Sequence, residues 1–381
     1  MYWRPAADKM LRFLTTISIY SLIVTSGASA IGVWKAISNF ASDFYQESAK
    51  STTGNVIISP FLVANSLALL LQAANGNTFD QIRNGLHLSG DKTAIANQFL
   101  EHYGMLQRGI GSASLSIANQ IYVQQGNELN KTLQEVAVQK FQSAIESVDF
   151  AKRDDTAQAI NHFVEEKTQG KIKELIQPNM LTSDSGIILL NAIYFKGDWE
   201  RKFNEKFLTK QNFHNSETET VSVDFMHIED EFNFALLDDL DAAALEMKIR
   251  LETKLKHHSL ASIIHKMRLE EVEVDIPKFK FEFEIKLNDV LKHLGIGEMF
   301  TPKTDLSGFF ETGESLQVSD VLHMAFIEVN EGGCEAAGVT SYKVVTRNNP
   351  VKFRANRPFL YFIWDNNSKT TVFSGRITAL N

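Results

Sequence analysis

One segment near the C-terminus has the residue pattern of a protease substrate that can change its structure. Residues 326–330 alternate apolar and polar side chains and lead into two glycines, which is typical of a half-buried strand that ends in a turn. The loop that follows keeps a strand's alternation, with small or apolar residues at every second position from Cys334 to Val344. It ends in the polar residues 346–348. Such a loop offers an extended peptide bond to a protease and could become a strand after cleavage.

Taken alone, this segment fits an ordinary mobile loop equally well, because long loops are either functional or disordered. The rest of the chain contains no catalytic set. The glycines at 295 and 297 lack the third glycine of a phosphate loop, there is no His-Glu-x-x-His motif, and Ser59 lacks a nucleophile elbow. His257, His258 and His265 lie in a charged stretch without a completing carboxylate or thiol. We therefore expect a protein that is not an enzyme and that binds no metal and no cofactor.

The segments that must position the loop show helix patterns first and strand patterns later. Helical periodicity predicts helices at residues 31–45, 65–74 (after a Ser59-Pro60 start), 97–106, 131–141 and 156–169. Strand patterns lie at residues 116–123, 186–194, 221–227, 232–237, 271–276, 278–285, 325–329, 359–364 and 370–377. No repeat or low-complexity linker interrupts this order. We predict an α+β fold with large sheets and a single domain over residues 31–381.

Composition excludes several classes of protein. The 381 residues are 44% hydrophobic and 22% charged, as in packed globular proteins. The net charge of −8 argues against nucleic acid as the main partner, which normally requires a basic face. We expect a soluble monomer that does not bind nucleic acid or a membrane.

The N-terminus has the features of an export signal. Basic residues up to Arg12 precede an apolar run at residues 13–24, and Ala28-Ser29-Ala30 supplies small residues at cleavage spacing. An uncleaved membrane anchor is the alternative, but the run is shorter than the roughly 20 residues that a spanning helix needs. We expect residues 1–30 to be a signal peptide, cleaved after Ala30, and the protein to be secreted into the extracellular space.

The single cysteine bears on how the fold is stabilised, and the glycosylation sequons are consistent with export. Cys334 is the only cysteine, so no internal disulfide can form and the core must provide the stability. Asn130 and Asn366 begin glycosylation sequons, although such triplets also arise by chance.

Several longer motifs, in order along the chain, carry a resemblance to a known family. They are Asn55-Val-Ile-Ile-Ser-Pro60, Asn161-His-Phe-Val-Glu-Glu-Lys-Thr-Gln-Gly-Lys-Ile172, Leu190-Asn-Ala-Ile-Tyr-Phe-Lys-Gly-Asp-Trp199, Ile276-Pro-Lys-Phe279, Asn356-Arg-Pro-Phe-Leu360 and Phe373-Ser-Gly-Arg376. Together with the segment from Glu331 to Ala337, they make the chain from about Ala36 to Asn381 resemble a serpin. The resemblance implies helices packed around three β-sheets and an exposed reactive-centre loop at about residues 331–353. It also implies that this loop inserts into a metastable five-stranded sheet once a protease has cut it.

The resemblance further implies where the loop is cut. Its hinge would comprise Glu331, Gly332, Gly333, Cys334, Glu335, Ala336 and Ala337. The family's spacing from Glu331 places the reactive bond between Arg347 and Asn348, and the position of Pro358 agrees with it. Arginine suits proteases with an acidic specificity pocket, although an isolated loop arginine is usually only solvated. The expected partner is a trypsin-like serine protease, held as a covalent acyl-enzyme.

Two further groups of residues match positions with known roles in the family. Ser59, Asn191 and His323 resemble the polar cluster under the middle of the central sheet, which must part for insertion. Lys278 and Glu331 resemble an ion pair beside Trp199, where the loop first enters the sheet. The simpler alternatives are a surface pair that contributes little to stability and a core aromatic residue.

The chain departs from the family pattern at single residues and at one deletion. Cys334, Gly332 and Leu62 replace residue types that are common in serpins, and none of the three forbids inhibition. After Arg250 the family normally has a turn, a buried strand of the second sheet and a short link, and here roughly 20 residues are missing, more than a typical strand. The loss would leave unpaired strand edges unless a neighbour substitutes.

These observations predict a secreted serpin that inhibits trypsin-like serine proteases as a suicide substrate. Two alternatives stay open. The first is a non-inhibitory serpin that acts as a carrier, storage protein or chaperone, and the second is a variant inactivated by the deletion after Arg250.

Overall fold

The structure is a computed structural model that describes residues 12–19, 30–110, 114–196, 199, 201–237, 242–249, 267–331, 350–365 and 367–381. Residues 332–349 lie outside the described residues, and with them the predicted reactive bond Arg347-Asn348 and the hinge residues Gly332, Gly333, Cys334, Glu335, Ala336 and Ala337. Residues 250–266, which contain His257, His258 and His265, are also outside the described part.

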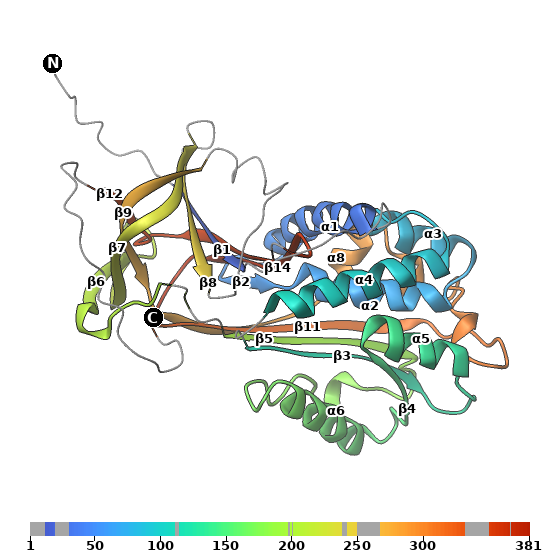
Figure 1. Ribbon diagram of the computed structural model, residues 1–381. Helices are drawn as coiled ribbons and strands as arrows, with labels where there is room; N and C mark the ends of the chain where they lie inside the picture. Colours follow the sequence, from blue (N-terminus) through green and yellow to red (C-terminus); the bar gives the residue numbers. More distant parts are fainter. Residues whose placement is uncertain are drawn as a thin grey trace.

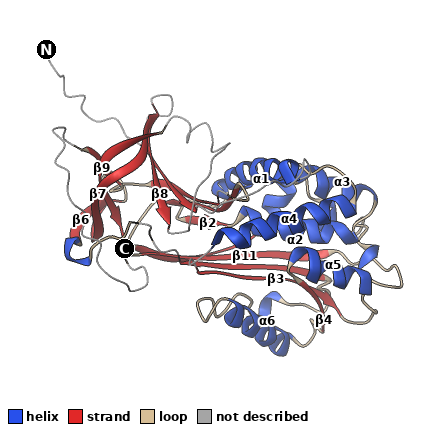
Figure 2. Ribbon diagram, viewed as in Figure 1, coloured by secondary structure: helices blue, strands red, loops and turns tan. Residues whose placement is uncertain are grey.

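The helices gather around one end of the molecule (Figures 1 and 2). They are α1 (Ala30–Lys50), α2 (Pro60–Ala73), α3 (Gly76–Gly85), α4 (Lys92–Ile110), α5 (Lys131–Phe141), α6 (Arg153–Lys167) and α8 (Asn288–His293), with 3-10 turns at Pro178–Met180, Glu205–Phe207, Glu298–Phe300 and Ser307–Phe309. The start of α2 follows the prediction, because Ser59 caps it through the Leu62 amide (3.4 Å) and Pro60 is its first residue.

A five-stranded sheet forms the centre of the helical end. Its strand order is β10 (Phe279–Lys286), β11 (Val318–Val329), β5 (Ile187–Lys196), β3 (Ser114–Gln124) and β4 (Ala144–Val148). β5 and β11 run parallel and are directly hydrogen-bonded, whereas β3 runs antiparallel to β5 and β10 antiparallel to β11.

A second, nine-stranded sheet forms the other end. Its order is β12 (Val351–Arg354), β9 (Arg268–Pro277), β7 (Thr220–Leu237), β8 (Ala242–Ile249), β1 (Arg12–Ile19), β13 (Phe359–Asp365), β14 (Thr370–Ile377) and β2 (Val56–Ile58), with β6 (Thr209–His214) paired to β7. Two of the three predicted sheets are joined here, because β7 is a single 18-residue strand where the sequence pattern predicted two. It pairs with β6 through its first part, with β9 through its middle and with β8 through its end.

The five-stranded sheet lies between helices on both faces. α2, α4 and α5 cover one face and α6 covers the other (Figure 1). The larger core cluster runs from Val33 in α1 to Leu380 and includes residues of both sheets. A smaller cluster packs Ile160 and Val164 of α6 against Leu190 and Leu322 in the sheet. The burial of apolar side chains on both faces therefore holds the central sheet in place.

Part of the predicted signal peptide forms a strand of the second sheet. Residues 12–19, within the predicted signal peptide, form β1 between β8 and β13 and run parallel to both. The strand thus occupies the place in the sheet next to β8, where the sequence indicated a missing strand. Among the described residues, no helix combines the length and the hydropathy needed to cross a membrane.

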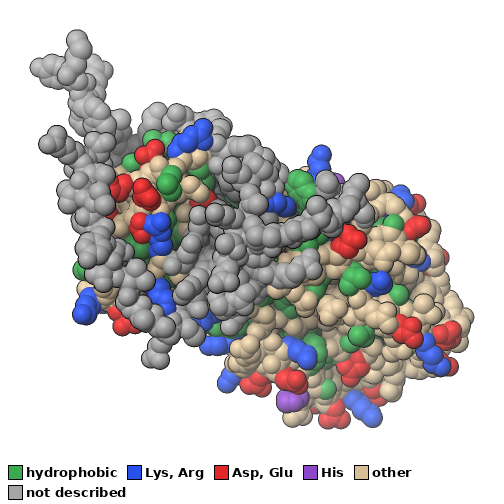
Figure 3. Space-filling view, viewed as in Figure 1, with side chains coloured by type: hydrophobic (Ala, Val, Ile, Leu, Met, Phe, Trp, Pro, Cys, Tyr) green, Lys and Arg blue, Asp and Glu red, His purple; other side chains and the backbone are tan. Residues whose placement is uncertain are grey.

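On one face of the molecule, charged side chains of both signs lie interspersed among the described residues (Figure 3). On the face shown in Figure 3, lysine and arginine alternate with aspartate and glutamate over the described residues.

Candidate functional site

The loop leaves the central sheet at the end of β11, and three predicted residues meet there. Lys278 Nζ lies 2.9 Å from Glu331 Oε1 and 2.7 Å from Oε2. The indole Nε1 of Trp199 donates to the carbonyl oxygen of Asn330 at 2.9 Å. Lys278 directly precedes β10, the edge strand beside β11. The structure therefore brings together the three residues that the sequence assigned to the point of loop insertion.

The pair between Lys278 and Glu331 is more than a fully exposed surface contact. The Glu331 side chain is 15% exposed and that of Lys278 is 31% exposed. Burial opposes ionisation of Glu331, but the hydrogen bond and the charge of Lys278 outweigh it, so the pKa of Glu331 lies below its ordinary value. Glu331, the first residue of the predicted hinge, is thus held as a carboxylate against Lys278, directly before β10.

A row of polar side chains crosses the middle of the central sheet. Asn119 of β3 is opposite Asn191 of β5, and Asn191 is opposite His323 of β11. Asn191 Nδ2 donates to the carbonyl oxygen of Leu322 at 3.3 Å, which links β5 to β11. The backbone amide of Ser59 donates to His323 Nε2 at 3.0 Å. Because these groups tie β5, β11 and α2 together, they must rearrange if another strand is to enter.

The structure adds two residues to the cluster that the sequence did not identify. Ser66 lies two turns along α2 from Ser59, and its Oγ hydrogen-bonds to Asn119 Oδ1 (2.5 Å) and to Asn191 Oδ1. Asn119 and Ser66 are almost inaccessible to solvent. The sequence did not single out either residue, because Ser66 follows another polar residue, Asn65, and Asn119 precedes Gln120.

His323 is neutral in this setting. Complete burial lowers the pKa of His323 to about 3, and the backbone of Asn191 offsets this only partly. Nε2 accepts the hydrogen bond from Ser59, so the single proton of the neutral ring is on Nδ1. The sheet-opening cluster is therefore a set of uncharged hydrogen-bonding groups.

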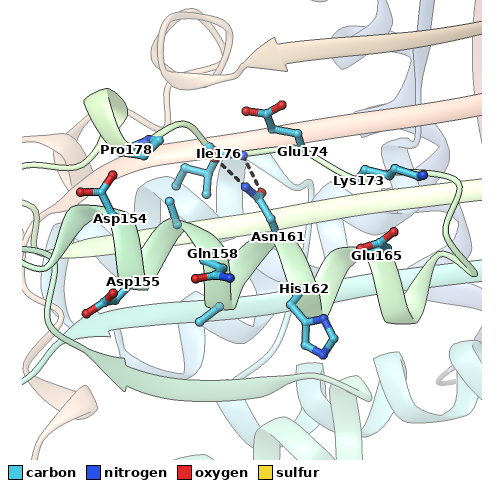
Figure 4. Close-up of a pocket in the computed structure, with 12 residues that line it drawn as sticks. Asp154, Asp155, Gln158, Asn161, His162, Glu165, Lys173, Glu174, Ile176 and Pro178 are labelled. Carbon is cyan, nitrogen blue, oxygen red and sulfur yellow. Dashed lines mark hydrogen bonds between the residues drawn. The ribbon is translucent and has the colours of Figure 1, made fainter.

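α6 and the segment after it cover the opposite face of the sheet, where they pack against Leu190 and Leu322. Asn161 of α6 accepts from the amides of Leu175 (2.9 Å) and Ile176 (3.0 Å) and donates to the Ile176 carbonyl (2.8 Å). Figure 4 shows the bonds between Asn161 and Ile176, at the side of a cavity of about 760 Å³ between α6 and Lys173 to Pro178. None of the predicted site residues lines that cavity. Asn161 thus joins α6 to the segment at residues 175–176, and α6 packs over β5 and β11, the two strands that insertion would separate.

The loop ends at β12, which a network of charges holds to β9. Lys352 Nζ lies 2.8 Å from Glu273 Oε2, and Arg354 Nε lies 3.0 Å from Asp275 Oδ2. His227 Nδ1 also contacts Asp275 Oδ1 at 2.9 Å. Ligand atoms of His227, Glu273 and Asp275 are within 4.8 Å of one another, but the two cationic side chains already neutralise the carboxylates. The arrangement anchors the strand that follows the loop.

The remaining predicted positions are placed as follows. Asn130 caps α5, with its Oδ1 accepting from the Leu133 amide at 2.9 Å. Asn366 lies outside the described residues, and Ser368 of its sequon is buried. Leu62 is fully buried in α2, so its departure from the family pattern adds to the core.

Comparison with known proteins decides the family. A family model described as serpin (serine protease inhibitor) matches residues 35–250 and 248–380. The chain belongs to the serpin family. The two matched stretches meet at residues 248–250, where the sequence indicated the deletion.

This serpin has similar relatives in arthropods. It is 34% identical over 372 residues to "Ipis-1" of Ixodes persulcatus, across 90% of this chain and 98% of the relative. It is 35% identical over 356 residues to "Serine protease inhibitor 42Dd" of Drosophila melanogaster, across 89% and 95%. The crystal structure of Serpin48 of Tenebrio molitor matches with a TM-score of 0.81 and 31% identity, covering 93% of this chain and 100% of that one. The family places this serpin among serine protease inhibitors rather than enzymes, with serine proteases as its partners.

Proposed function

We propose that this serpin inhibits trypsin-like serine proteases and that the protease cuts it between Arg347 and Asn348. One structural observation carries the proposal. β5 and β11 are directly paired from Ile187–Val318 to Phe195–Ile327, and the strand-patterned loop begins where β11 ends. Because β5 and β11 run parallel, one antiparallel strand could pair with both, and the segment after β11 has an alternation that suits a strand.

The chemistry belongs to the protease. Its serine oxygen attacks the carbonyl carbon of Arg347 and forms an ester, while the amine of Asn348 leaves with a proton supplied by the protease histidine. The arginine guanidinium would pair with a carboxylate in the protease pocket through two parallel hydrogen bonds. The serpin contributes the substrate and the structural change that follows.

Insertion gains backbone hydrogen bonds. A strand that turns back from β11 runs antiparallel to β11 and, because β5 is parallel to β11, antiparallel to β5 as well. The one ladder between β5 and β11 is replaced by two ladders, and the alternate small and apolar residues of the loop become buried. To admit the strand, the link between Asn191 and Leu322 must break and the layer fastened by Asn161 must move.

Insertion also explains why the acyl-enzyme would persist. The protease is attached to Arg347 and is pulled along as the loop enters the sheet. Distortion of its oxyanion hole then slows hydrolysis of the ester, since the loss of one donor costs on the order of 100-fold or more in rate.

The test is incubation with trypsin followed by denaturing gel electrophoresis. We expect a covalent complex for the natural chain and none for Arg347→Glu, because a carboxylate repels an acidic pocket. Arg153→Glu is the matched control, since Arg153 is exposed at the start of α6, and it should form the complex normally. A complex that persists in Arg347→Glu would rule out the assigned bond.

A non-inhibitory serpin is the second candidate, and the break in the family match at residues 248–250 favours it. Loop cleavage by trypsin without a covalent complex and without a rise in melting temperature would support this candidate.

Export through residues 1–30 with cleavage after Ala30 is a separate candidate, and it excludes a role for β1 in the mature protein, because residues 12–19 would be removed. N-terminal sequencing of the protein from culture medium tests it, with Ile31 as the expected first residue.

A further inference from the structure

The strand that fills the second sheet comes from a distant part of the chain. β8 and β13 are not paired with each other in this sheet, and β1 lies between them. Its pairing with β13 runs from Phe13–Phe359 to Ile19–Asp365, and its pairing with β8 extends from Arg12–Ala242 to Ile19–Ile249. In Figure 1 it is the blue strand among the yellow and red strands of this end of the molecule.

The direction of β1 shows that it replaces a local strand. A strand joined to β8 by a tight turn would run antiparallel to it, whereas β1 runs parallel to both neighbours. The family match breaks just after β8, at residues 248–250. The place left open by the deletion is thus occupied by the N-terminal segment, with ladders that are slightly less stable than antiparallel ones.

The neighbouring strands need a partner at this place. Leu245 of β8 and Ile363 of β13 are fully buried in the larger core cluster. Ala244 of β8 is fully buried in a separate cluster on the sheet, against which Leu360 of β13 packs. Without β1, both strands would expose unpaired amides and carbonyls along their inner edges, next to apolar surface on two faces. Such edges cost stability and promote association with other strands.

The segment is suited to a central strand. Arg12–Ile19 contains Phe13, Ile17 and Ile19 together with two threonines, which are residue types enriched in strands. It contains no proline and no glycine, the two residues that interrupt central strands.

We propose that the folded protein retains residues 12–19 as β1, and that the gap between β8 and β13 is a binding site for this one segment. Cleavage after Ala30 would remove the strand and leave the gap open. Retention of β1 therefore competes with the export candidate, and a folded protein that begins at Ile31 with a complete second sheet would rule retention out. The proposal does not depend on inhibition at Arg347, so each can fail without the other.

The first experiment compares two substitutions in the full chain, produced without passage through an export pathway. Thr15→Pro removes an amide from a strand that is paired on both sides, whereas Thr15→Val keeps the strand propensity. We expect a clear fall in melting temperature for the proline variant and little change for the valine variant. Equal melting temperatures for the two variants would overturn the proposal.

The second experiment uses the chain that begins at Ile31 and a labelled peptide with the sequence of Arg12–Ile19. We expect this chain to melt at lower temperature or to self-associate, and to bind the peptide saturably with a rise in melting temperature. A scrambled peptide of the same composition should not bind. The proposal is wrong if the shortened chain is monomeric, as stable as the full chain and indifferent to the peptide. If the shortened chain does not fold, the comparison of the Thr15 variants decides.

Discussion

At the scale of residues, buried histidines make the fold sensitive to acid. His102 in α4 is fully buried beside Phe61 and hydrogen-bonds through Nε2 to Thr370 Oγ1. Burial lowers the pKa of His102 to about 3, as it does for His323. The ordinary value of 6.5 applies after unfolding, so between about pH 6.5 and pH 3 the unfolded state binds more protons. The free energy of unfolding therefore falls as the pH is lowered through this window.

His102→Gln isolates this contribution. From pH 7.5 to pH 5, neutral His102 accounts for a loss of about 2 kcal/mol in the free energy of unfolding, and the glutamine variant should lose that much less. His162→Gln, at an exposed site on α6, should keep the full pH dependence. Asp365, whose pKa burial raises to about 6, acts in the opposite direction and is common to all three proteins. Denaturant unfolding at the two pH values provides the measurement, and identical pH dependence in all three would contradict the account.

The pair between Lys278 and Glu331 should be measurably coupled. A double-mutant cycle with Lys278→Met and Glu331→Gln is expected to give about 1 kcal/mol, above the few tenths that are usual for exposed pairs. Because the folded pKa of Glu331 lies below its ordinary value of 4.5, the coupling is present at neutral pH and is lost as the pH falls below about 4.5. A coupling energy near zero at pH 7 would mean that the contact does not hold the hinge.

The sequence predicted the principal residues of this site but not all of their partners. Ser59 and Asn191 were assigned through the motifs that contain them, and His323 through the resemblance to the family as a whole. Ser66 and Asn119 were missed, because their role depends on strand register and on the side of α2 that faces the sheet, which only tertiary structure defines.

At the scale of elements, β12 is expected to depend on its charges. Lys352 and Arg354 both contact Glu273, and the hydrogen bond with Lys352, together with these charges, holds the pKa of Glu273 below its ordinary value despite partial burial. Changing both residues to glutamate would place negative charges on β12 opposite Glu273 and Asp275 of β9, and like charges directly opposite each other destabilise a pair of strands.

Hydrogen exchange at the Phe353 amide measures the result. Phe353 is fully buried in β12, so the double variant should exchange faster there and melt at lower temperature. Lys210→Glu is the control, since Lys210 is an exposed residue of β6, and it should leave Phe353 protected. Unchanged exchange in the Lys352 and Arg354 double variant would show that backbone pairing alone holds β12.

The elements themselves followed the sequence where their periodicity was strong. α5 and β14 have the predicted bounds. The short strands β2, β4, β6 and β12 were missed, because three to six residues carry too little alternation to be separated from a loop. The strand β8 and the helices α3 and α8 were not predicted either. The sequence pattern predicted two strands in place of β7, separated at the acidic residues 229–231. In the structure the pairing of β7 with β9 continues through these residues.

At the scale of the whole molecule, the sequence predicted the serpin fold and the break after β8 but not what fills it. An apolar run behind basic residues has the same pattern in a leader and in a buried strand. Which role it has depends on whether a gap exists elsewhere in the fold, and local sequence contains no information on that.

The two proposals concern two places where a strand would enter a sheet. One lies between β5 and β11, where cleavage of the loop would add a strand. The other lies between β8 and β13, where β1 completes the second sheet. The central claim concerns the first place, because trapping of a protease requires both the cut at Arg347 and the insertion that follows.

Mass spectrometry of the reaction with trypsin tests that claim most directly. The account predicts a released C-terminal fragment that begins at Asn348, together with a covalent species in which trypsin is esterified to Arg347. A fragment that begins elsewhere in the loop, or the fragment from Asn348 without any covalent species, would contradict it.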